Sequence, residues 1–229
     1  VLNLTGMVVA VISIILSLKP KFGNLRTSMK SLWRETKEYG FHVYIGRTIA
    51  TSTHNLDRIL ISYFVNTVSV GFYHLALVLT SPMALLSQTL SISLFKEFAS
   101  KQKIPRKVIS FNFLWLLACV AGLSLLGKFI VIILFSKRYL SVVPLILPLA
   151  LAGFFEGMFQ PYNMFLGAHG KGEWLRNIAI VFACTVFILN LVLIQVWGAM
   201  GAAIASLTAC ILCYFFHVGY YNKLLREEI

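Results

Sequence analysis

The chain has 229 residues and a formal net charge of +12, and 59% of its residues are hydrophobic while only 12% are charged. Soluble domains carry about 25% charged residues, so this composition excludes a cytosolic enzyme built around a single buried core. At about 20 residues per span, the apolar content is sufficient for several transmembrane helices.

The first apolar run, Leu2–Leu18, is long enough for one membrane helix. It lacks the basic n-region and the small-residue cleavage site of a signal peptide. Because the chain opens on Val1 rather than on Met, we expect that part of the protein precedes this run.

The segment that follows, residues 19–40, is rich in Lys and Arg, and it places Met29, Leu32 and Trp33 on one face of a helix. Such a helix would lie on the inner leaflet of the membrane, where the ring of Trp33 suits the headgroup region. A solvated basic linker is the alternative interpretation.

The second run, Phe41–Phe64, carries polar residues that a membrane helix does not expose to lipid without cost. They step by three or four positions and share one helical face, the polar stripe, which consists of Tyr44, Arg47, Thr51, His54, Arg58 and Ser62. The stripe spans about 27 Å, nearly the full hydrocarbon thickness of a bilayer. We expect it to line an aqueous cavity, because snorkelling of Arg47 and Arg58 to the two surfaces leaves His54 unexplained.

Asp57 lies beside the polar stripe and is the only aspartate in the chain. Two roles are open for its carboxylate. It could balance the charge of His54 one turn earlier, or it could bind a proton or a cation, as lone intramembrane carboxylates do.

The third run, Val70–Phe95, has a weaker polar face that includes Gln88 and is interrupted by Pro82. The fourth run, Val108–Gly127, is followed by the short apolar stretch Phe129–Phe135. This stretch is too short to cross a bilayer, so it either lies at the interface or extends the preceding helix.

The fifth run, Val142–Gly167, brings Glu156, Gln160 and Asn163 to one helical face at positions i, i+4 and i+7. Glu156 is the one glutamate that falls inside an apolar run. Together with Asp57 it is a candidate for coupling transport to H⁺ or Na⁺.

The last two runs are Ile178–Trp197 and Ala202–Tyr221. All runs are read as helices, because a helix satisfies its own backbone in lipid and the alternation of a membrane barrel is absent. The predicted fold class is therefore an all-α, polytopic membrane helix bundle. The four cysteines fall in apolar runs without ligand partners, and we interpret them as packing residues.

The basic residues alternate between loops. Fifteen of the twenty Lys and Arg residues fall within residues 19–40, 96–107, 171–176 and 223–226, and three fall in the opposite loops. By the positive-inside rule these four segments and the C-terminal tail are cytoplasmic. Most of the positive net charge thus comes from residues that mark the cytoplasmic side of the membrane, and nucleic acid is not an expected partner.

A cavity lined by two arginines, a histidine and several amides suits an anionic ligand, above all one that carries phosphate. The candidate substrate-binding residues are Tyr44, Arg47, Thr51, His54, Arg58, Gln88, Gln160 and Asn163. The sequence has no glycine-rich nucleotide loop, nucleophile–base pair or metal-ligand cluster. We therefore expect no enzymatic activity, metal or cofactor, apart from a coupling ion.

Several local strings occur in a characteristic order. They are HNLDRILISYF with SVGFYHLA (residues 54–64 and 69–76), LFKEFA (94–99), LFSKRY with VP (134–139 and 143–144), FLGAHGK (165–171) and WGAMGAAIAS (197–206). In this order they resemble the Wzx-type polysaccharide flippases of the MATE-like MOP exporter superfamily, over about residues 41–221. Ser136 stands where that family often has glycine.

The resemblance implies the C-terminal half of a transporter whose two six-helix lobes face each other around a central cavity. Residues 1–18 would be the last helix of a truncated N-terminal lobe, residues 19–40 a basic cytoplasmic linker, residues 41–221 the C-terminal six-helix lobe and residues 222–229 a cytoplasmic tail. The function that the resemblance implies is to flip an undecaprenyl-diphosphate-linked oligosaccharide across the cytoplasmic (inner) membrane by alternating access, for polysaccharide or O-antigen biosynthesis. The implied partners are this oligosaccharide, membrane lipids, the missing lobe and a polysaccharide polymerase.

The alternative function is a cation-coupled exporter of drugs or other small molecules from the same superfamily. Such a pump would be expected to present carboxylates and aromatic rings to a cationic ligand, whereas the predicted cavity is net positive. A membrane-embedded polymerase or ligase would need a large outer loop with acids or histidines, and the longest outer connection is short. A scaffold without transport activity leaves the polar stripe without a role.

Overall fold

The computed structural model describes residues 13, 29–30, 32–34 and 36–227, and this part of the chain is helical without strands. The all-α fold class is confirmed. The predicted helix Leu2–Leu18 and most of the predicted basic linker lie outside the described residues. Contacts divide the chain into Val1–Glu38 and Tyr39–Ile229. The architecture below is that of the second unit.

The helices follow the apolar runs closely. In chain order they are η1 (Thr36–Gly40), α3 (Phe41–Phe64), α4 (Thr67–Ser93), α5 (Phe95–Ala99), α6 (Arg106–Phe135), η2 (Lys137–Val142), α7 (Val143–Ala168) and α8 (Gly172–Glu227). α6 includes Phe129–Phe135, so this stretch extends the preceding helix. Pro82 lies inside α4, and Pro148 and Pro161 lie inside α7.

Four helical segments of the described chain are long and apolar enough to cross a membrane: α4, α6, η2 with α7, and α8. The chain is therefore a multi-pass membrane protein. α3 has 24 residues, enough for a span, but its polar stripe lowers its hydropathy and keeps it out of this group. α8 contains a non-helical residue, Gly198, and is two antiparallel helices joined at that point.

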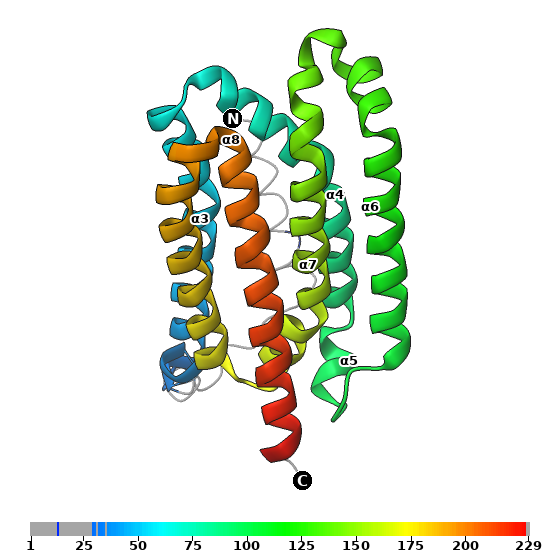
Figure 1. Ribbon diagram of the computed structural model, residues 1–229. Coiled ribbons are helices and arrows are strands. Elements are labelled where there is room, and N and C mark those ends of the chain that lie inside the picture. Colours follow the sequence, from blue (N-terminus) through cyan, green and yellow to red (C-terminus); the bar gives the residue numbers. More distant parts are fainter. Residues whose placement is uncertain (1–12, 14–28, 31, 35, 228–229) are drawn as a thin grey trace. The chain divides into compact units, whose positions relative to one another are not determined.

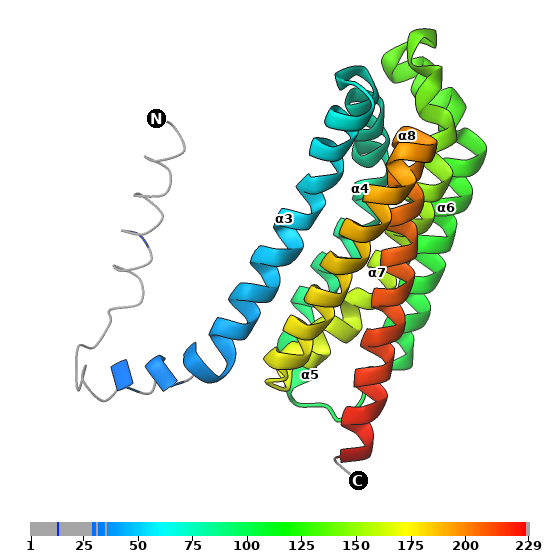
Figure 2. The ribbon, with the colours of Figure 1, turned by 60° about the vertical axis from the view of Figure 1, so that its left-hand side comes forward.

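α7 occupies the centre of the bundle, where it packs against α4, α6 and α8 (Figure 1). α3 packs mainly against α8, at the opposite side of the bundle from α6 (Figure 2). The connections around residues 100–105 and 169–171 lie at the same end as the C-terminus, at the bottom of Figure 1. The turns after α3 and α6 and the break in α8 lie at the other end.

The outer surface of the bundle is strongly apolar. Leu125 and Ile133 on α6 are 76% and 80% exposed, and Val196 on α8 is 67% exposed. In water such a surface would cause aggregation, whereas in a bilayer it faces lipid tails of the same polarity. The core is correspondingly narrow and is concentrated along α7.

Two glycines form the turn that divides α8. Gly198 has φ 57° and ψ −135°, a conformation with a positive φ that side chains other than glycine rarely adopt. Gly201 begins the second half of α8 directly against the end of the first half. A Cβ atom on Gly201 would lie 2.0 Å from the carbonyl oxygen of Leu193 and 2.3 Å from its carbonyl carbon.

A buried amide joins three helices next to the proline in α7. Because Pro161 has no N–H, the carbonyl of Gly157 loses its helical partner. Asn112 on α6, which is 2% exposed, donates from Nδ2 to this carbonyl oxygen at 2.9 Å. Its Oδ1 accepts from the hydroxyl of Ser87 on α4 at 2.6 Å.

Replacing Asn112 by leucine is expected to lower the stability of the membrane-embedded protein by about 1 to 2 kcal/mol, the upper range for one interhelical hydrogen-bond network in a membrane. The substitution keeps an apolar volume but leaves the Gly157 carbonyl unpaired. The measurement is thermal unfolding of the full-length protein in detergent. Asn222→Leu, at an exposed position of α8, is the matched control. An equal midpoint for the two variants would contradict the prediction.

Candidate functional site

The side chain of Asp57 is the centre of a buried polar network that joins α3, α4 and both halves of α8. Asp57 is 5% exposed. Its Oδ2 accepts hydrogen bonds from the hydroxyls of Tyr73, at 2.8 Å, and Ser206, at 3.2 Å. Its Oδ1 accepts from Nδ2 of Asn190 at 2.5 Å. Three helical segments therefore orient this one carboxylate.

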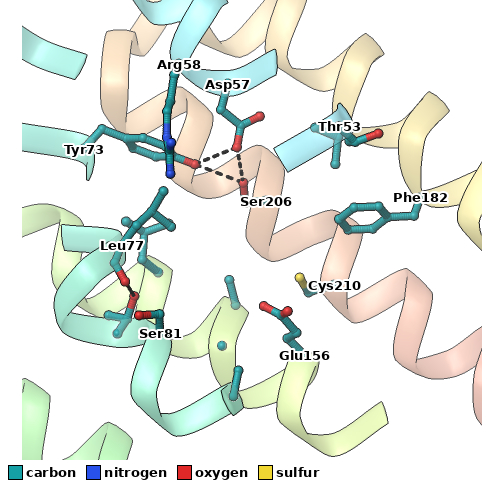
Figure 3. A pocket seen from close by; sticks show the side chains of 16 residues that line it. Thr53, Asp57, Arg58, Tyr73, Leu77, Ser81, Glu156, Phe182, Ser206 and Cys210 are labelled. Atoms are coloured by element: carbon teal, nitrogen blue, oxygen red, sulfur yellow. Dashed lines mark hydrogen bonds between the residues drawn. The ribbon is translucent and has the colours of Figure 1, made fainter. Parts of the chain in front are cut away.

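A cavity of about 320 Å³ opens beside this network, and we name it the Asp57 cavity. Figure 3 shows Asp57 and Arg58 from α3 and Glu156 from α7 around the same space. Its other polar lining residues are Thr53, Tyr73, Thr80, Ser81, Ser206 and Cys210. The cavity thus contains two carboxylates, one guanidinium and several hydroxyl groups within a membrane helix bundle.

Two buried polar atoms at this network lack a hydrogen-bond partner among the described residues: Nε of Arg58 and Oδ1 of Asn190. Buried polar atoms of this kind usually mark a bound water, an ion or a functional group. The oxygens of Asp57, Tyr73 and Ser206 lie together at the wall of the cavity, and Nδ2 of Asn190 holds the carboxylate from the other side. This set of oxygens is suited to a proton or a small cation.

A second cavity, of about 250 Å³, lies towards the end of the bundle that carries the C-terminus, and we name it the Arg47 cavity. Arg47 on α3 and Arg176 on α8 both line it. Its other polar residues are Thr51, Gln88, Glu156, Gln160 and Asn163. Two arginines, three amide residues and one glutamate therefore line one space, and the balance of charge among them is positive.

The polar stripe of α3 does not line a single cavity. Arg47 and Thr51 line the Arg47 cavity, whereas Arg58 lines the Asp57 cavity. Tyr44 is 69% exposed and lines a shallow depression on α3 together with Arg47 and Thr51, which are exposed as well. His54 lies in α3, but its side chain is outside the described part of the chain.

The face of α3 that is covered by its neighbours lies beside the stripe. Gly46, Thr53, Asp57 and Ile61 are buried there. A Cβ atom on Gly46 would lie 3.2 Å from Cα of Arg176, so the backbones of α3 and α8 approach closely at this level. The stripe therefore stays open on the side of α3 that α8 does not cover.

The predicted residues of the later helices do come together. Gln88, Gln160 and Asn163 all line the Arg47 cavity. Glu156 lines both cavities and is the residue that connects them. Asn163 is also positioned by a hydrogen bond, because its Nδ2 lies 3.1 Å from Nε2 of the buried His217.

Sequence reasoning missed four residues of the site: Tyr73, Arg176, Asn190 and Ser206. The sequence predicts Arg176 in a cytoplasmic loop because the apolar run begins only at Ile178, whereas α8 begins at Gly172. Asn190 could have been predicted as a site residue, since a lone amide in an apolar run is costly unless it has a hydrogen-bond partner. The hydroxyls of Tyr73 and Ser206 carried no signal of their own.

Residues 2–144, more than half of the chain, match the sequence model of the family described as polysaccharide biosynthesis protein. The uncharacterized membrane protein MJ1068 of Methanocaldococcus jannaschii is 27% identical over 224 residues, which cover 91% of this chain and 43% of that protein. The teichuronic acid biosynthesis protein TuaB of Bacillus subtilis is 27% identical over 146 residues, 58% of this chain and 30% of that protein. The chain thus spans less than half the length of these relatives, and no solved structure matches it.

Proposed function

The chain belongs to the polysaccharide biosynthesis protein family, whose members are of the transporter type rather than enzymes, and on this premise we propose that it is half of a flippase. The proposed substrate is an oligosaccharide linked through a diphosphate to undecaprenol. The protein would move it from the cytoplasmic to the outer leaflet of the cytoplasmic membrane by alternating access. A polysaccharide polymerase would then use the product.

The observation that carries this proposal is the composition of the Arg47 cavity. Arg47 and Arg176 approach it from two different helices, so two planar guanidinium groups can bind the oxygens of a diphosphate from two sides. Three amides complete the lining, and amides pair readily with sugar hydroxyls. A drug or metal-cation pump would need a negative balance of charge in the same place.

The volume of the Arg47 cavity is consistent with a site for part of the ligand only. About 250 Å³ holds a diphosphate with little more than one sugar. The remaining sugars need further space, and the open side of α3 offers the exposed polar residues Tyr44 and Thr48. In the proposed full-length protein, a second lobe opposite α3 would close this space.

The Asp57 cavity is the proposed site of ion coupling. Asp57, Ser206 and Tyr73 offer oxygens to a proton or to Na⁺, Asn190 holds the carboxylate through its Nδ2, and Glu156 lines both this cavity and the Arg47 cavity. A change of charge at Asp57 would alter the contacts of α3 with both halves of α8. Movement of α3 relative to α8 would in turn change the distance between Arg47 and Arg176, so ion binding and substrate binding would be linked.

Replacing Arg47 by glutamine in the full-length protein is expected to reduce export of polysaccharide about tenfold or more, the effect of losing one charge-assisted hydrogen bond to phosphate. The measurement is surface polysaccharide in cells that depend on this protein, normalised to its membrane level. Arg138→Gln, at an exposed position of η2, is the matched control and is expected to keep full export.

Normal export by the Arg47→Gln variant would overturn the proposed role of this cavity. In that case Arg47 would only snorkel to the membrane surface. Loss of export in both arginine variants would indicate a general requirement for positive charge. The flippase proposal therefore depends on the difference between the two positions.

A further inference from the structure

Arg176 is held on the wall of the Arg47 cavity by uncharged groups. Its Nη1 donates to Nδ1 of His42 at 2.8 Å. Its Nε and Nη2 donate to Oδ1 of Asn177 at 3.3 and 3.1 Å. His42 lies in the first turn of α3 and Arg176 in the second turn of α8, so this contact joins the two helices next to the cavity.

The hydrogen bond defines the protonation state of His42. Because Nδ1 accepts from a guanidinium, it carries no proton, and the imidazole is neutral with its proton on Nε2. Nε2 faces Oε1 of Glu173 at 3.6 Å. The side chain of His42 is 19% exposed, which is sufficient for proton exchange with water.

We propose that His42 is a proton-operated latch on Arg176, and that protonation of His42 releases the Arg176 guanidinium to bind a diphosphate group in the Arg47 cavity. This inference rests on the proposed function for the identity of the ligand. It adds a residue, His42, that does not itself line the cavity and acts on the ligand through Arg176.

The latch opens because protonation changes the hydrogen bonding of the His42 imidazole. A proton on Nδ1 removes the acceptor of the Arg176 hydrogen bond and places a positive charge beside the guanidinium. The same proton strengthens the attraction of the ring to Glu173, which draws His42 away from Arg176. The freed Nη1 group then needs an acceptor, and an anionic oxygen in the cavity provides one.

The titratable and charged groups near His42 divide into those that face its imidazole and those that do not. Glu173 and Arg176 face it from α8. From η1, Tyr39 packs near Gly172, and burial raises the pKa of its phenol, so it stays neutral at physiological pH. Arg47 and Glu156 face the cavity rather than the imidazole. His42 is therefore the group to substitute.

Two variants of His42 fix the latch in opposite states. In His42→Gln, the amide oxygen can accept from Arg176 and the amide nitrogen can donate to Glu173, so the latch stays closed at every pH. In His42→Phe, no acceptor faces Arg176, so the latch stays open. Arg176→Gln removes the latched group, and Arg226→Gln, exposed in the last turn of α8, is the matched control.

The experiment is calorimetric binding of inorganic pyrophosphate to the full-length protein in lipid nanodiscs, at pH of about 8 and about 5.5, which span the range in which a histidine side chain can change charge. The pH dependence of pyrophosphate binding to His42→Gln contains the titration of the ligand itself and serves as the reference. Relative to this reference, wild-type protein and Arg226→Gln are expected to bind pyrophosphate about tenfold more tightly at the lower pH. His42→Phe is expected to bind at the higher pH about tenfold more tightly than wild type. Arg176→Gln is expected to lose the pH-linked gain.

An identical pH profile for wild type and His42→Gln would overturn the latch, and so would a profile unchanged by Arg176→Gln. A second arm identifies the source of the diphosphate. Undecaprenyl diphosphate placed in the nanodisc is expected to displace pyrophosphate more effectively than soluble uridine diphosphate does. Displacement by the soluble compound alone would overturn the lipid-linked substrate while leaving the His42 latch intact, so the two proposals fail separately.

Discussion

Replacing Gly201 by alanine is expected to prevent the two halves of α8 from forming their hairpin, at a cost of about 4 kcal/mol or more. The added Cβ would stand 2.0 Å from the carbonyl oxygen of Leu193 and 2.9 Å from the amide nitrogen of Ile194. These are backbone atoms, and they cannot move aside as the end of a side chain can. Ile194 is itself buried in the core around Tyr73 and Ile61, so the disturbance would reach the Asp57 network.

Two measurements check this expectation on the full-length protein. The yield of monodisperse protein after size-exclusion chromatography in detergent should fall strongly, and the remaining protein should unfold at a lower temperature. Gly219→Ala is the matched control, since Gly219 lies in the same helix and an added Cβ there meets no atom within 4 Å. If both variants behaved like wild type, the close approach at Gly201 would be wrong.

Sequence patterns located the helices well because each one has a simple local cause. α3 begins and ends at Phe41 and Phe64, as predicted, since the basic linker precedes it and the polar Asn66 caps the next helix. The resemblance to polysaccharide flippases is likewise confirmed by the family match. Helical periodicity also placed Gln88, Gln160 and Asn163 on faces that do meet in one cavity.

The candidate site was predicted less completely, because it depends on which faces of different helices meet. The stripe on α3 indicated one continuous surface, but the packing of α8 against Gly46 and Asp57 divides it between two cavities. The hydrogen bond from Asn190 to Asp57 joins residues 133 positions apart, and no local pattern contains it. Arg176 was missed because a polar first turn of a membrane helix resembles a loop.

A substitution at Asp57 tests the other half of the proposed mechanism. Asn has nearly the same shape as Asp, so Asp57→Asn is expected to keep most of the hydrogen bonds with Tyr73, Asn190 and Ser206 and to remain folded. It removes the negative charge and the group that can bind a proton. If Asp57 is the coupling site, the variant can no longer use an ion gradient to drive the movement of α3 relative to α8.

We therefore expect Asp57→Asn to lower gradient-driven flipping by about a hundredfold, which corresponds to a coupling free energy of about 3 kcal/mol. The assay is translocation of the lipid-linked oligosaccharide in proteoliposomes under an imposed gradient of H⁺ or Na⁺. Glu97→Gln is the control, because Glu97 is an exposed carboxylate of α5 paired with Lys101. Pyrophosphate should still bind in the Arg47 cavity of both variants, since that cavity is lined by other residues, but in Asp57→Asn its affinity should no longer depend on the coupling ion. Full gradient-driven flipping by the Asp57→Asn variant would remove Asp57 from the coupling mechanism and leave Glu156, the carboxylate shared by both cavities, as the group to test.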